Sequence, residues 1–559
     1  MKGKKLLSLL MCTLLAAGAL GACGQGAGES GGESRNQSSE VKESSGTESQ
    51  EAAQGEGTNE EQTWQVTLAV PVNGPVDEKN ETLDYLNSLV PGLEFKIEAI
   101  EIGSYWDILN PRLASGEIPD IFHCHSDSMY RSYLEQGVLG GVAPELIKEC
   151  MPEFVSDLKE CDATGAWSLV LDNGLIYGLP IVTGERTYNF TNGWRMDWLK
   201  AVGIDKVPET VEEYEEAFTR FTFNDPDGNG VDDTYGTTLR GKDSTPNLFP
   251  SLFGAYGIFP GMWNLAEDGT LKFGITDPRG KEALEKLHSW YEKGLIDPEF
   301  ISVDGVGRTE KWANSKVGAL VDTTYYNLQP GDAIYDGLLA LTPEAEVVSG
   351  PAPKGEDGDY GYMNWGRYTN RVVFGKTLLA DEEKLKKVLQ LYDLISTDFE
   401  VCARLRCGVE GTHWEYNEFR VPQKFPAYSD AANNGPSGLN TFWQGGIPYT
   451  PIVGDLFEGS NIEELNKYGK EGTLVNGENY FSYLGKFVPD EVGTAYKAEA
   501  DTLYKTNFID FITGARPLEE YDAFVEEWMA AGGEAYTKAH NECWQNIETI
   551  MAEAESIFN

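Results

Sequence analysis

The chain has 559 residues, too many for one ordinary hydrophobic core, so its length predicts more than one domain. Its 90 Asp and Glu residues outnumber its 44 Lys and Arg residues, which gives a formal charge of −46. This excess argues against nucleic acid and against an anionic membrane surface as partners, because both need clustered cations. It suits a neutral or cationic ligand, or simply a soluble acidic surface.

The first residues have the pattern of an export signal. Lysines near the amino terminus precede an apolar run, residues 6–15, that is too short to span a bilayer. The run leads to Leu20-Gly-Ala-Cys23, which resembles the lipobox of bacterial lipoproteins, where the Cys thiol carries diacylglycerol. We therefore expect residues 1–23 to be a lipoprotein signal with a lipid anchor on Cys23. The alternative is an ordinary secretory signal in which this Cys occurs by chance.

Residues 24–62 consist almost entirely of Gly, Ser, Glu, Gln, Asn and Thr, and they contain no aromatic side chain. Such a composition cannot bury enough apolar surface to offset the entropy of an unfolded chain. We expect a disordered, negatively charged linker whose ends lie roughly 35 Å apart as a random coil. That reach would hold a folded body away from a membrane and let it reorient.

From residue 63 onward, short strands alternate with amphipathic helices. The expected strands are residues 63–70, 93–100 and 316–325, and the expected helices are residues 81–89, 105–114, 144–158, 211–221, 278–293, 382–396, 399–405, 491–511, 518–531 and 536–557. This alternation predicts an α/β fold with sheets covered by helices. In such folds ligands bind beyond the carboxyl ends of strands, which makes residues 120–127 an early site candidate.

Two short segments have other expected roles. Residues 175–180 are too short and too limited by Pro180 for a central strand, so we expect them to form a hinge between two sheets. Residues 263–269 have the pattern of a hairpin, which would give Trp263 a structural role.

Residues 225–236 have the spacing of an EF-hand calcium loop. The expected oxygen donors are Asp225, Asp227, Asn229, Val231 through its carbonyl, and Asp233. Position 12 is Gly236 rather than a bidentate Glu, so another carboxylate would have to come from elsewhere in the fold. We expect a structural Ca²⁺ ion here. The alternative is a solvated acidic turn, since Asp, Asn, Gly and Pro all favour turns.

The sequence contains no GxSxG, HExxH, P-loop or GxGxxG motif in a suitable context. Carboxylate pairs of the kind that a glycosidase uses are too easily found in so acidic a chain to indicate one. His123 and His125 flank Cys124 and would share one face of a strand, which permits a metal site. Polar residues in a loop at the end of a strand are the commoner explanation.

Cysteines are the next candidates for special chemistry. Beyond the signal they are Cys124, Cys150, Cys161, Cys402, Cys407 and Cys543, without a CxxC pair or a zinc-like Cys/His spacing. Export would permit disulfides, and Cys150/Cys161 and Cys402/Cys407 are the closest pairs in sequence. Buried free thiols are the equal alternative.

Seven aromatic residues lie in or near predicted loops and strand ends. They are Trp194, Trp263, Trp312, Tyr325, Trp365, Trp414 and Trp443. An aromatic face stacks on the C–H face of a sugar ring while polar neighbours bond to its hydroxyls, so some of these residues suit a carbohydrate ligand. Core packing is the alternative for most of them.

Several motifs in this order resemble those of family 1 bacterial extracellular solute-binding proteins, of the carbohydrate ABC-transporter type, and especially their large lipoprotein branch in Gram-positive bacteria. The motifs are Ser115-Gly-Glu-Ile-Pro-Asp-Ile-Phe122, Asn173-Gly-Leu-Ile-Tyr-Gly-Leu-Pro180, Arg195-Met-Asp-Trp-Leu199, residues 225–236, Gly294-Leu-Ile-Asp-Pro-Glu-Phe300, Gly408-Val-Glu-Gly411, Phe511-Ile-Thr-Gly-Ala-Arg-Pro517 and Glu526-Glu-Trp-Met-Ala-Ala-Gly-Gly533. The resemblance covers essentially residues 64–559.

The resemblance implies the two-lobed α/β fold of type II periplasmic binding proteins, with the lobes joined by hinge strands. Lobe 1 would comprise residues 63–179 and 366–409, and lobe 2 residues 180–365 and 410–559. The chain would cross between them near Leu179–Val182, Asn364–Tyr368 and Arg406–Glu410.

The resemblance also implies where a ligand binds. The implied ligand-binding residues are Asp127, Glu185, Tyr325, Tyr326, Trp365, Arg367, Glu410, Trp414 and Trp443. Cys124 stands where maltose-binding proteins carry a Trp, so sugar stacking is not implied at that position.

The implied function is that of a substrate-binding receptor held on the extracellular face of the cell membrane by the lipid on Cys23. It would be a monomer that binds an oligosaccharide between its lobes and delivers it to the permease subunits of an ABC importer, without covalent chemistry. A receptor for another solute such as a peptide is one alternative, and a secreted glycan-active enzyme or an adhesin is another. A pair of ionisable groups with perturbed pKa values would favour the enzyme, and a site floored by aromatic rings the receptor.

Overall fold

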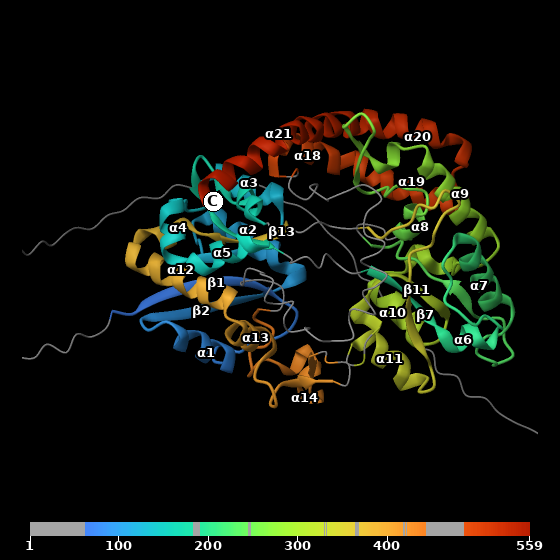
Figure 1. Cartoon of the computed structure of the whole chain (residues 1–559), viewed down its shortest axis with the longest axis horizontal. Coiled ribbons are helices and arrows are strands. Elements are labelled where there is room, and N and C mark those ends of the chain that lie inside the picture. The colour runs from blue at the N-terminus through green and yellow to red at the C-terminus, as the bar shows by residue number, and fades with distance from the viewer. Residues whose placement is uncertain are drawn as a thin grey trace, which may run out of the picture. The chain divides into compact units, whose positions relative to one another are not determined.

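The computed structural model describes residues 62–161, 163–182, 190–243, 248–328, 330, 332–363, 368–417, 420, 422–442, 484 and 486–559. All of the described residues lie in the compact unit Glu61–Asn559. That unit contains two larger β-sheets, each covered by helices (Figure 1).

The first sheet has the strand order β2-β1-β3-β13-β6. Its strands are β1 (Trp64–Val72), β2 (Leu93–Glu101), β3 (Ile121–Cys124), β6 (Gly178–Val182) and β13 (Tyr368–Phe374). β1 runs parallel to β2 and β3, while β13 runs antiparallel to β3 and β6. The strands expected at residues 63–70 and 93–100 are therefore confirmed as β1 and β2. The stretch that contains Pro180 is the edge strand β6, where a residue without an N–H donor is tolerated.

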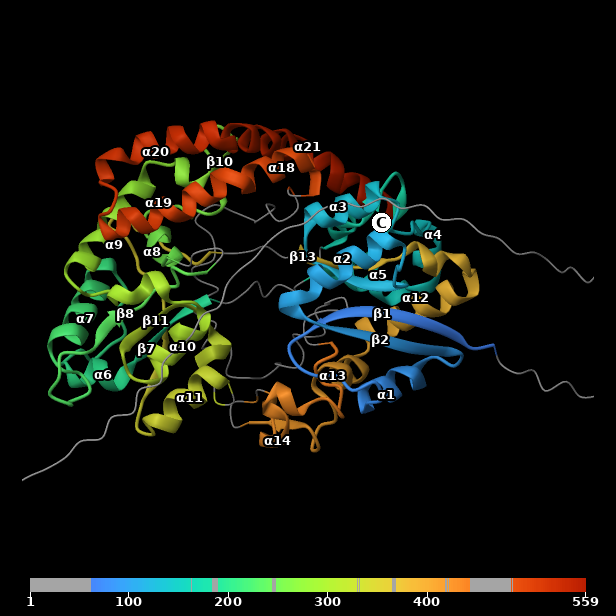
Figure 2. The same cartoon turned by 180° about the vertical axis from the view of Figure 1, so that it is seen from behind.

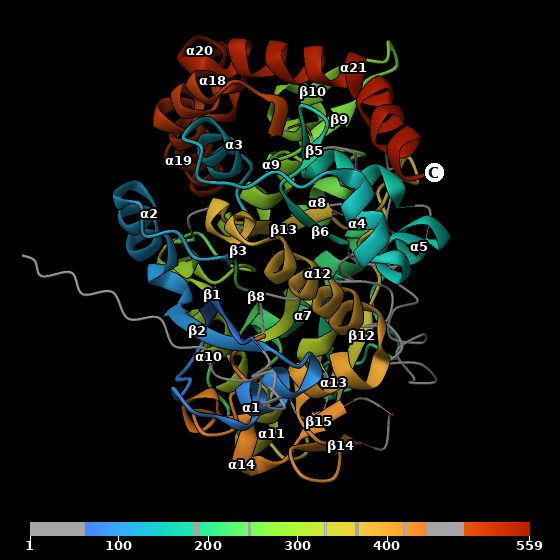
Figure 3. The ribbon, with the colours of Figure 1, turned by 90° about the vertical axis from the view of Figure 1, so that its left-hand side faces the viewer.

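Helices cover both faces of the first sheet (Figure 3). They are α1 (Glu81–Leu89), α2 (Tyr105–Ser115), α3 (Asp127–Glu135), α4 (Pro144–Cys150), α5 (Pro152–Glu160), α12 (Glu382–Thr397) and α13 (Phe399–Cys407). Leu68 belongs to a buried cluster that includes residues of α4, α5 and α12, whereas its neighbour Ala69 belongs to another that includes residues of α2 and α3. Alternate residues of a strand point to opposite faces, so a strand covered on both sides is apolar throughout.

One expected helix is divided in the structure. Residues 144–158 form α4 and α5, which meet at Met151 and Pro152. Proline has no backbone N–H and its ring clashes with the preceding turn, so it begins a helix readily but does not continue one. The prediction of one continuous helix here was wrong for that reason.

The second sheet has the strand order β12-β7-β11-β8. Its strands are β7 (Phe190–Arg195), β8 (Tyr235–Thr237), β11 (Val317–Thr324) and β12 (Val347–Gly350), and its neighbouring helices include α6 (Met196–Ala201), α7 (Val211–Phe223), α9 (Arg279–Glu292), α10 (Gly305–Ala313) and α11 (Ala333–Leu341). The fully buried Trp194 of β7 packs against rings of α7. Trp312 of α10 and Leu338 of α11 belong to a separate cluster with Leu320 of β11. Trp194 and Trp312 are therefore core residues.

Smaller elements complete the fold. They are the strand pairs β4 (Leu171–Asp172) with β5 (Leu175–Ile176), β9 (Trp263–Leu265) with β10 (Leu271–Phe273) and β14 (Trp414–Tyr416) with β15 (Pro422–Lys424), and the short helices α8 (Pro250–Gly254) and α14 (Pro426–Ser429). The hairpin expected around residues 263–269 is confirmed as β9 and β10, and Trp263 in it is buried.

The carboxyl-terminal part is helical, as expected, and runs through α18 (Asp490–Ala495), α19 (Asp501–Thr513), α20 (Tyr521–Trp528) and α21 (Glu534–Phe558). Wider π-type turns separate α18 from α19 and α20 from α21. In α21, Asn541 exchanges hydrogen bonds of 2.8 Å with the backbone of Leu271 in β10. Near its other end Phe558 stacks on Trp167 of a 3₁₀ turn, at 4.1 Å between ring centroids. This helix therefore joins two distant parts of the fold (Figures 1 and 2).

The segment that follows α13 belongs beside the first sheet. The backbone N–H groups of Asp77, Glu81 and Thr82 donate to carbonyls of residues 435–437, at 3.1 Å in each case. Sequence analysis had assigned residues 410–559 to the second lobe. These hydrogen bonds tie residues 435–437 to the start of α1 and to the segment before it, beside the first sheet.

The structure shows whether the cysteines form disulfides. The six cysteines of the described part, Cys124, Cys150, Cys161, Cys402, Cys407 and Cys543, are all free thiols. Of the two possibilities left open by the sequence, the structure therefore shows thiols and not the Cys150/Cys161 or Cys402/Cys407 bridges.

In the part of the chain that the structure describes, no helix combines the length and the apolar character that crossing a bilayer would require.

Candidate functional site

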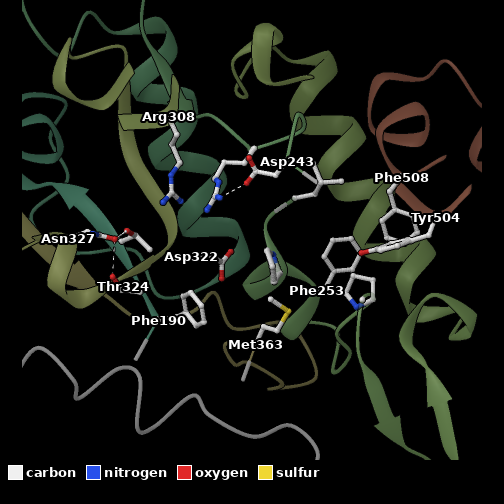
Figure 4. A pocket seen from close by; sticks show the side chains of 16 residues that line it. Phe190, Asp243, Phe253, Arg308, Asp322, Thr324, Asn327, Met363, Tyr504 and Phe508 are labelled. Carbon is white, nitrogen blue, oxygen red and sulfur yellow. Dashed lines mark hydrogen bonds and ion pairs between the residues drawn. The ribbon is translucent and has the colours of Figure 1, made fainter. Parts of the chain in front are cut away.

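A pocket of about 310 Å³ lies beside the second sheet, between the ends of β7 and β11 and the helices α8, α10 and α19 (Figure 4). Its walls combine aromatic rings with charged and hydroxyl side chains. The lining residues are Phe190, Arg240, Asp243, Leu248, Pro250, Phe253, Pro260, Gly261, Arg308, Asp322, Thr323, Thr324, Asn327, Met363, Tyr504 and Phe508. An enclosed apolar surface with a few convergent polar groups is typical of a small-molecule site.

Asp322 is the most unusual residue of the pocket. It has a φ angle of 49°, in the left-handed region that side chains other than Gly rarely adopt, and it lies at an irregularity in the pairing of β11 with β7. Asn192 of β7 holds this backbone by accepting the Asp322 N–H at 2.7 Å. A strained backbone supported by buried hydrogen bonds is more frequent at functional sites than elsewhere.

The carboxylate of Asp322 has little compensation for its burial. It accepts the N–H of Ser251, at 3.1 Å to Oδ1 and 3.3 Å to Oδ2. Burial raises the pKa of Asp322 to about 7, although Ser251 and the more distant Arg308 favour the ionised form. The carboxyl group therefore changes charge near neutral pH.

Arg308 enters the pocket from α10 and is also buried. One of its terminal nitrogens donates to the carbonyl of Val321 at 3.1 Å, while Nε has no hydrogen-bond partner among the described residues. Burial and the nearby charge of Arg240 lower the pKa of Arg308 to about 10. Figure 4 shows this guanidinium and the Asp322 carboxylate directed toward the same space.

A second pair of charges lies at the edge of the pocket. Arg240 and Asp243 form an ion pair, visible in Figure 4. The opposite wall is aromatic: Phe253 of α8 stacks on Phe508 of α19 with 5.9 Å between ring centroids, and Tyr504 meets Phe508 edge to face. Rings on one side and hydrogen-bonding groups on the other suit a ligand with one apolar and one polar face.

Several residues expected to bind ligand lie outside the described residues. They are Glu185, Trp365, Arg367 and Trp443, and the expected lipid site Cys23 does as well. Most of the expected crossing near Asn364–Tyr368 falls there too, whereas the one near Leu179–Val182 lies in strand β6 and the one near Arg406–Glu410 begins in the last turn of α13.

The other expected ligand residues are spread over the fold. Asp127 begins α3 and forms an ion pair with the buried Arg371 of β13. Trp414 is buried, and its indole Nε1 donates to the carbonyl of Gly408 at 3.0 Å. Glu410 is paired with Trp414 through an isolated backbone bridge, in the same turn. Tyr325 and Tyr326 begin the 3₁₀ turn that directly follows β11 and therefore lie next in the chain to pocket residues.

The pocket lies at the end of the strand that precedes Tyr325 and Tyr326, and most of its lining residues were not predicted from the sequence. Asp322 interrupts the otherwise apolar and hydroxyl-bearing run Val317–Thr324, and an ionisable residue inside a buried strand was a usable signal. Arg308 and Phe508 lie on helices far away in sequence, and no local pattern brings them to this strand.

The expected calcium loop has the donor set of such a site, but its residues bond to one another. The Asp225 carboxylate accepts the N–H groups of Asn229 and Gly230 at 3.0 Å, and Asp233 forms an ion pair of 2.5 Å with Lys316. Burial and the charges of its neighbours raise the pKa of Asp227. Within the described ranges, no cluster of three or more His, Cys, Asp or Glu residues is arranged to hold a metal.

Position 12 of this loop has a physical reason to be glycine. A Cβ atom on Gly236 would stand 2.4 Å from the side chain of Phe218, which occupies that space. A Glu cannot stand there, so the loop must complete any ion site differently from a standard EF-hand.

No protein-family model matches the chain. Lipoprotein LipO of Bacillus subtilis is 26% identical over 476 residues, which cover 81% of this chain and 87% of LipO. The polygalacturonan/rhamnogalacturonan-binding protein YtcQ of the same bacterium is 23% identical over 355 residues, covering 63% of this chain and 67% of YtcQ.

FusA, a fructooligosaccharide ABC transporter substrate-binding protein of Streptococcus pneumoniae, is 28% identical over 243 residues, 42% of this chain and 44% of FusA. Its structure in complex with kestose matches with a TM-score of 0.67 at 18% identity, covering 87% of this chain and 100% of the FusA chain. A structure of an EF-hand mutant of FusA matches with the same score. The expected two-lobed solute-binding fold is thereby confirmed, and so is the expected resemblance.

Proposed function

We infer that this chain, an extracellular solute-binding protein by its fold and its relatives, is the substrate-binding receptor of an ABC importer for an oligosaccharide. The observation that carries this proposal is the pocket beside β11, where stacked rings face buried Arg308 and Asp322. Sugars need such a combination, because their C–H faces pack on rings while their hydroxyls form hydrogen bonds. Asp322 and Arg308 both have displaced pKa values, but Arg308, with a pKa of about 10, keeps its proton at neutral pH, so the pair lacks the second proton-transferring group that a glycan-cleaving enzyme needs. Binding and release require only closure and opening of lobes.

The names of the relatives support a carbohydrate over a peptide. FusA is named for fructooligosaccharides and YtcQ for polygalacturonan and rhamnogalacturonan. We propose that the pocket binds one ring of the ligand and that Asp127, Glu185, Tyr325, Tyr326, Trp365, Arg367, Glu410, Trp414 and Trp443 remain candidates for the other rings. We further propose that the first lobe consists of residues 63–182 and 368–442.

The experiment is calorimetric titration with kestose, maltotriose, cellotriose and trigalacturonate, with the release of reducing sugar followed in parallel. We expect one of these sugars to bind without being cleaved. Arg308→Gln should lower its affinity at least tenfold, because a buried donor to the ligand is shortened and uncharged. Arg220→Gln is the matched control, since Arg220 lies half-exposed on α7 and bonds to Val202 and Glu216 instead. Hydrolysis of the sugar, or failure of every sugar to bind, would overturn the receptor function.

We also propose that the loop of residues 225–236 binds a structural Ca²⁺ ion. Asp225, Asp227, Asn229, Val231 and Asp233 would hold it, and Ca²⁺ would supply the positive charge that Lys316 now gives to Asp233. The donor chemistry supports this, because carboxylate and carbonyl oxygens are the ligands that Ca²⁺ prefers. The EF-hand named for FusA supports it as well.

Thermal unfolding with and without a chelator tests the calcium site. We expect Ca²⁺ to raise Tm by about 4 °C or more and Asp227→Asn to remove that gain, because binding to the folded state alone stabilises it. Asp232→Asn is the control, since Asp232 lies in the same loop but at a position that donates no ligand. A Tm that is the same in chelator and in Ca²⁺ would leave only an acidic turn.

Finally, we propose that Cys23 carries the lipid that retains the receptor at the extracellular face of the membrane, as a monomer that docks on the permease. The name of LipO supports a lipoprotein. Detergent phase partitioning of cell extracts tests it: the protein should enter the detergent phase, and Cys23→Ser should move it to the aqueous phase. Cys12→Ser, inside the signal, should leave the partition unchanged. If both variants partition alike, the lipid lies elsewhere or is absent.

A further inference from the structure

The pocket keeps two opposite charges buried and apart. Asp322 and Arg308 are 4% and 7% exposed, yet they form no ion pair with each other in the described part of the chain. Each instead has a pKa displaced toward its uncharged form, because burial outweighs their mutual attraction. The Nε atom of Arg308, a residue of the pocket lining, is also buried without a partner among the described atoms. The fold thus withholds hydrogen bonds from groups that border an open space.

A hydroxyl-bearing ring satisfies both charges at once. One hydroxyl can donate to the Asp322 carboxylate while another accepts from the Arg308 guanidinium, and each such bond is strengthened by the charge. A ligand carboxylate would suit Arg308 but would meet a like charge on Asp322. The ion pair of Arg240 with Asp243 adds no net charge at the rim.

We propose that this pocket takes an uncharged sugar ring between Asp322 and Arg308, and that the ring expels a proton from Asp322 as it binds. This inference rests on the proposed function, and it specifies that the ligand is uncharged and that Asp322 is the residue that distinguishes it from an acidic sugar. The strained backbone of Asp322 serves this role, because it turns the carboxylate of a strand residue into the pocket.

Among the groups around Asp322, Asp322 itself is the one that gains or loses a proton near neutral pH. Arg308 faces it from α10, Tyr214 from α7, and Tyr362 from the segment before β13. Burial raises the pKa values of both tyrosines far above neutrality, so they keep their protons. Asn192 and Ser251, which contact Asp322 directly, do not titrate.

The direction of the pH dependence follows from linkage. Hydroxyl donors stabilise the ionised carboxylate, so a neutral sugar lowers the pKa of Asp322 and is bound better when the proton has left. If only the ionised form binds, affinity should fall on the order of 20-fold between pH 7.5 and pH 5.5. An acidic sugar would show the reverse: proton uptake, and affinity that rises as the pH falls.

The experiment is titration of the whole protein with kestose, maltotriose, cellotriose and trigalacturonate, at pH 5.5, 6.5 and 7.5. At pH 6.5 it is repeated in two buffers of different ionisation enthalpy, which counts the protons exchanged. We expect a neutral sugar to bind with release of about half a proton or more, and trigalacturonate to bind weakly or not at all. A neutral sugar that binds without proton exchange would overturn the inference and leave the proposed function intact. Preference for trigalacturonate with proton uptake would do the same. If no sugar binds at any pH, both fail.

The variant that isolates the carboxyl group is Asp322→Asn. Asn tolerates the positive φ angle and keeps an oxygen for the Ser251 N–H, so the backbone is retained. We expect it to bind the neutral sugar more weakly at pH 7.5, without proton release and with affinity that no longer depends on pH. Asp297→Asn is the control: Asp297 is equally buried but pairs with Lys311 and bonds to Thr238, away from the pocket lining. Proton release that persists in Asp322→Asn would assign it to another group and overturn the inference.

Discussion

Two buried arginines, Arg371 in the first sheet and Arg308 beside the second, differ in whether a carboxylate pairs with them, although each has a buried side-chain nitrogen without a hydrogen-bond partner among the described residues. Arg371 forms an ion pair with Asp127 and lies over the ring of Tyr130, 4.6 Å from its centroid. Burial disfavours its charge, but Asp127 outweighs burial and the pKa of Arg371 is raised. Arg308 has no such partner among the described residues, and burial lowers its pKa.

The difference separates a structural charge from one that is held ready for a ligand. A buried charge that has its partner ties elements together, here β13 to α3. A buried charge without a partner costs stability, and such sites are retained where a ligand later supplies the partner. On this reasoning the first arginine fixes the fold and the second contributes to function.

The largest expected effect separates the two arginines directly. Arg371→Met should lower the free energy of unfolding by about 3 kcal/mol, because it leaves Asp127 without its partner. Arg308→Met should cost about 1 kcal/mol or less, since losing the bond to Val321 is offset by removing a poorly compensated buried charge. Urea unfolding at pH 7 measures both. Equal losses of unfolding free energy in the two variants would show that Arg308 contributes to stability as much as Arg371 does, and would contradict the contrast.

An effect of similar size on stability is expected from Asp322→Asn. The folded-state pKa of about 7 lies above the ordinary value near 4, so the folded state binds this proton more tightly than the unfolded state. The stability that protonation contributes is complete below about pH 4 and is lost as the pH rises through 7. The variant should therefore be more stable than the wild type by on the order of 3 kcal/mol at pH 6, and the difference should shrink toward pH 4.

Urea unfolding across that pH range measures the difference, and Asp297→Asn serves as its control. Asp297 pairs with Lys311, so its replacement should destabilise the protein throughout the range. An Asp322→Asn protein that is less stable than the wild type at pH 6 would show that the carboxylate is well compensated in the absence of ligand.

Much of the fold could be predicted because it depends on local patterns. The bounds of α1 were predicted from its apolar periodicity, and Asn80 caps it through a 2.8 Å bond from the Leu83 N–H. The loop of residues 225–236 was also recognised from local spacing, because its candidate donors lie within one short stretch of chain, and its calcium site stays a prediction. By contrast, the division of residues 144–158 required weighing Pro152 against the helical pattern.

The pocket could be predicted only in part, because it is built by tertiary packing. The end of β11 was an expected site, and its turn holds Tyr325 and Tyr326 as expected. Arg308 reaches the same place from α10, and Phe508 from α19, almost 200 positions later in the chain. The buried charge in Val317–Thr324 was the one local signal, and apolar periodicity concealed it.

The smallest expected effect concerns Lys486, a second buried cation close to Arg371 beside the first sheet. Lys486 donates to the carbonyls of Ser168 and Leu171, at 2.5 and 2.8 Å, and burial together with the nearby Arg371 lowers its pKa to about 7. Between that value and the ordinary one near 10.4 the unfolded state binds more protons, so this lysine makes stability rise with pH. Asp127, Asp172 and Arg131 also act on its charge.

Lys486→Met should remove this alkaline gain. From pH 7.5 to pH 9 the wild type should gain about 2 kcal/mol of unfolding free energy relative to the variant, as measured by urea unfolding at each pH. Lys505→Met is the control, because Lys505 lies partly exposed on α19 with Asp501 as its partner. If the stability of Lys486→Met rises with pH as much as that of the wild type, Lys486 does not cause the rise. Lys486 would then be charged in the folded protein and compensated by its neighbours, as Arg371 is. If the rise is absent from Lys486→Met, the two regions differ only in how many buried charges lack a partner. The first sheet then has one poorly compensated cation beside a paired one, while both buried charges of the pocket are unpaired.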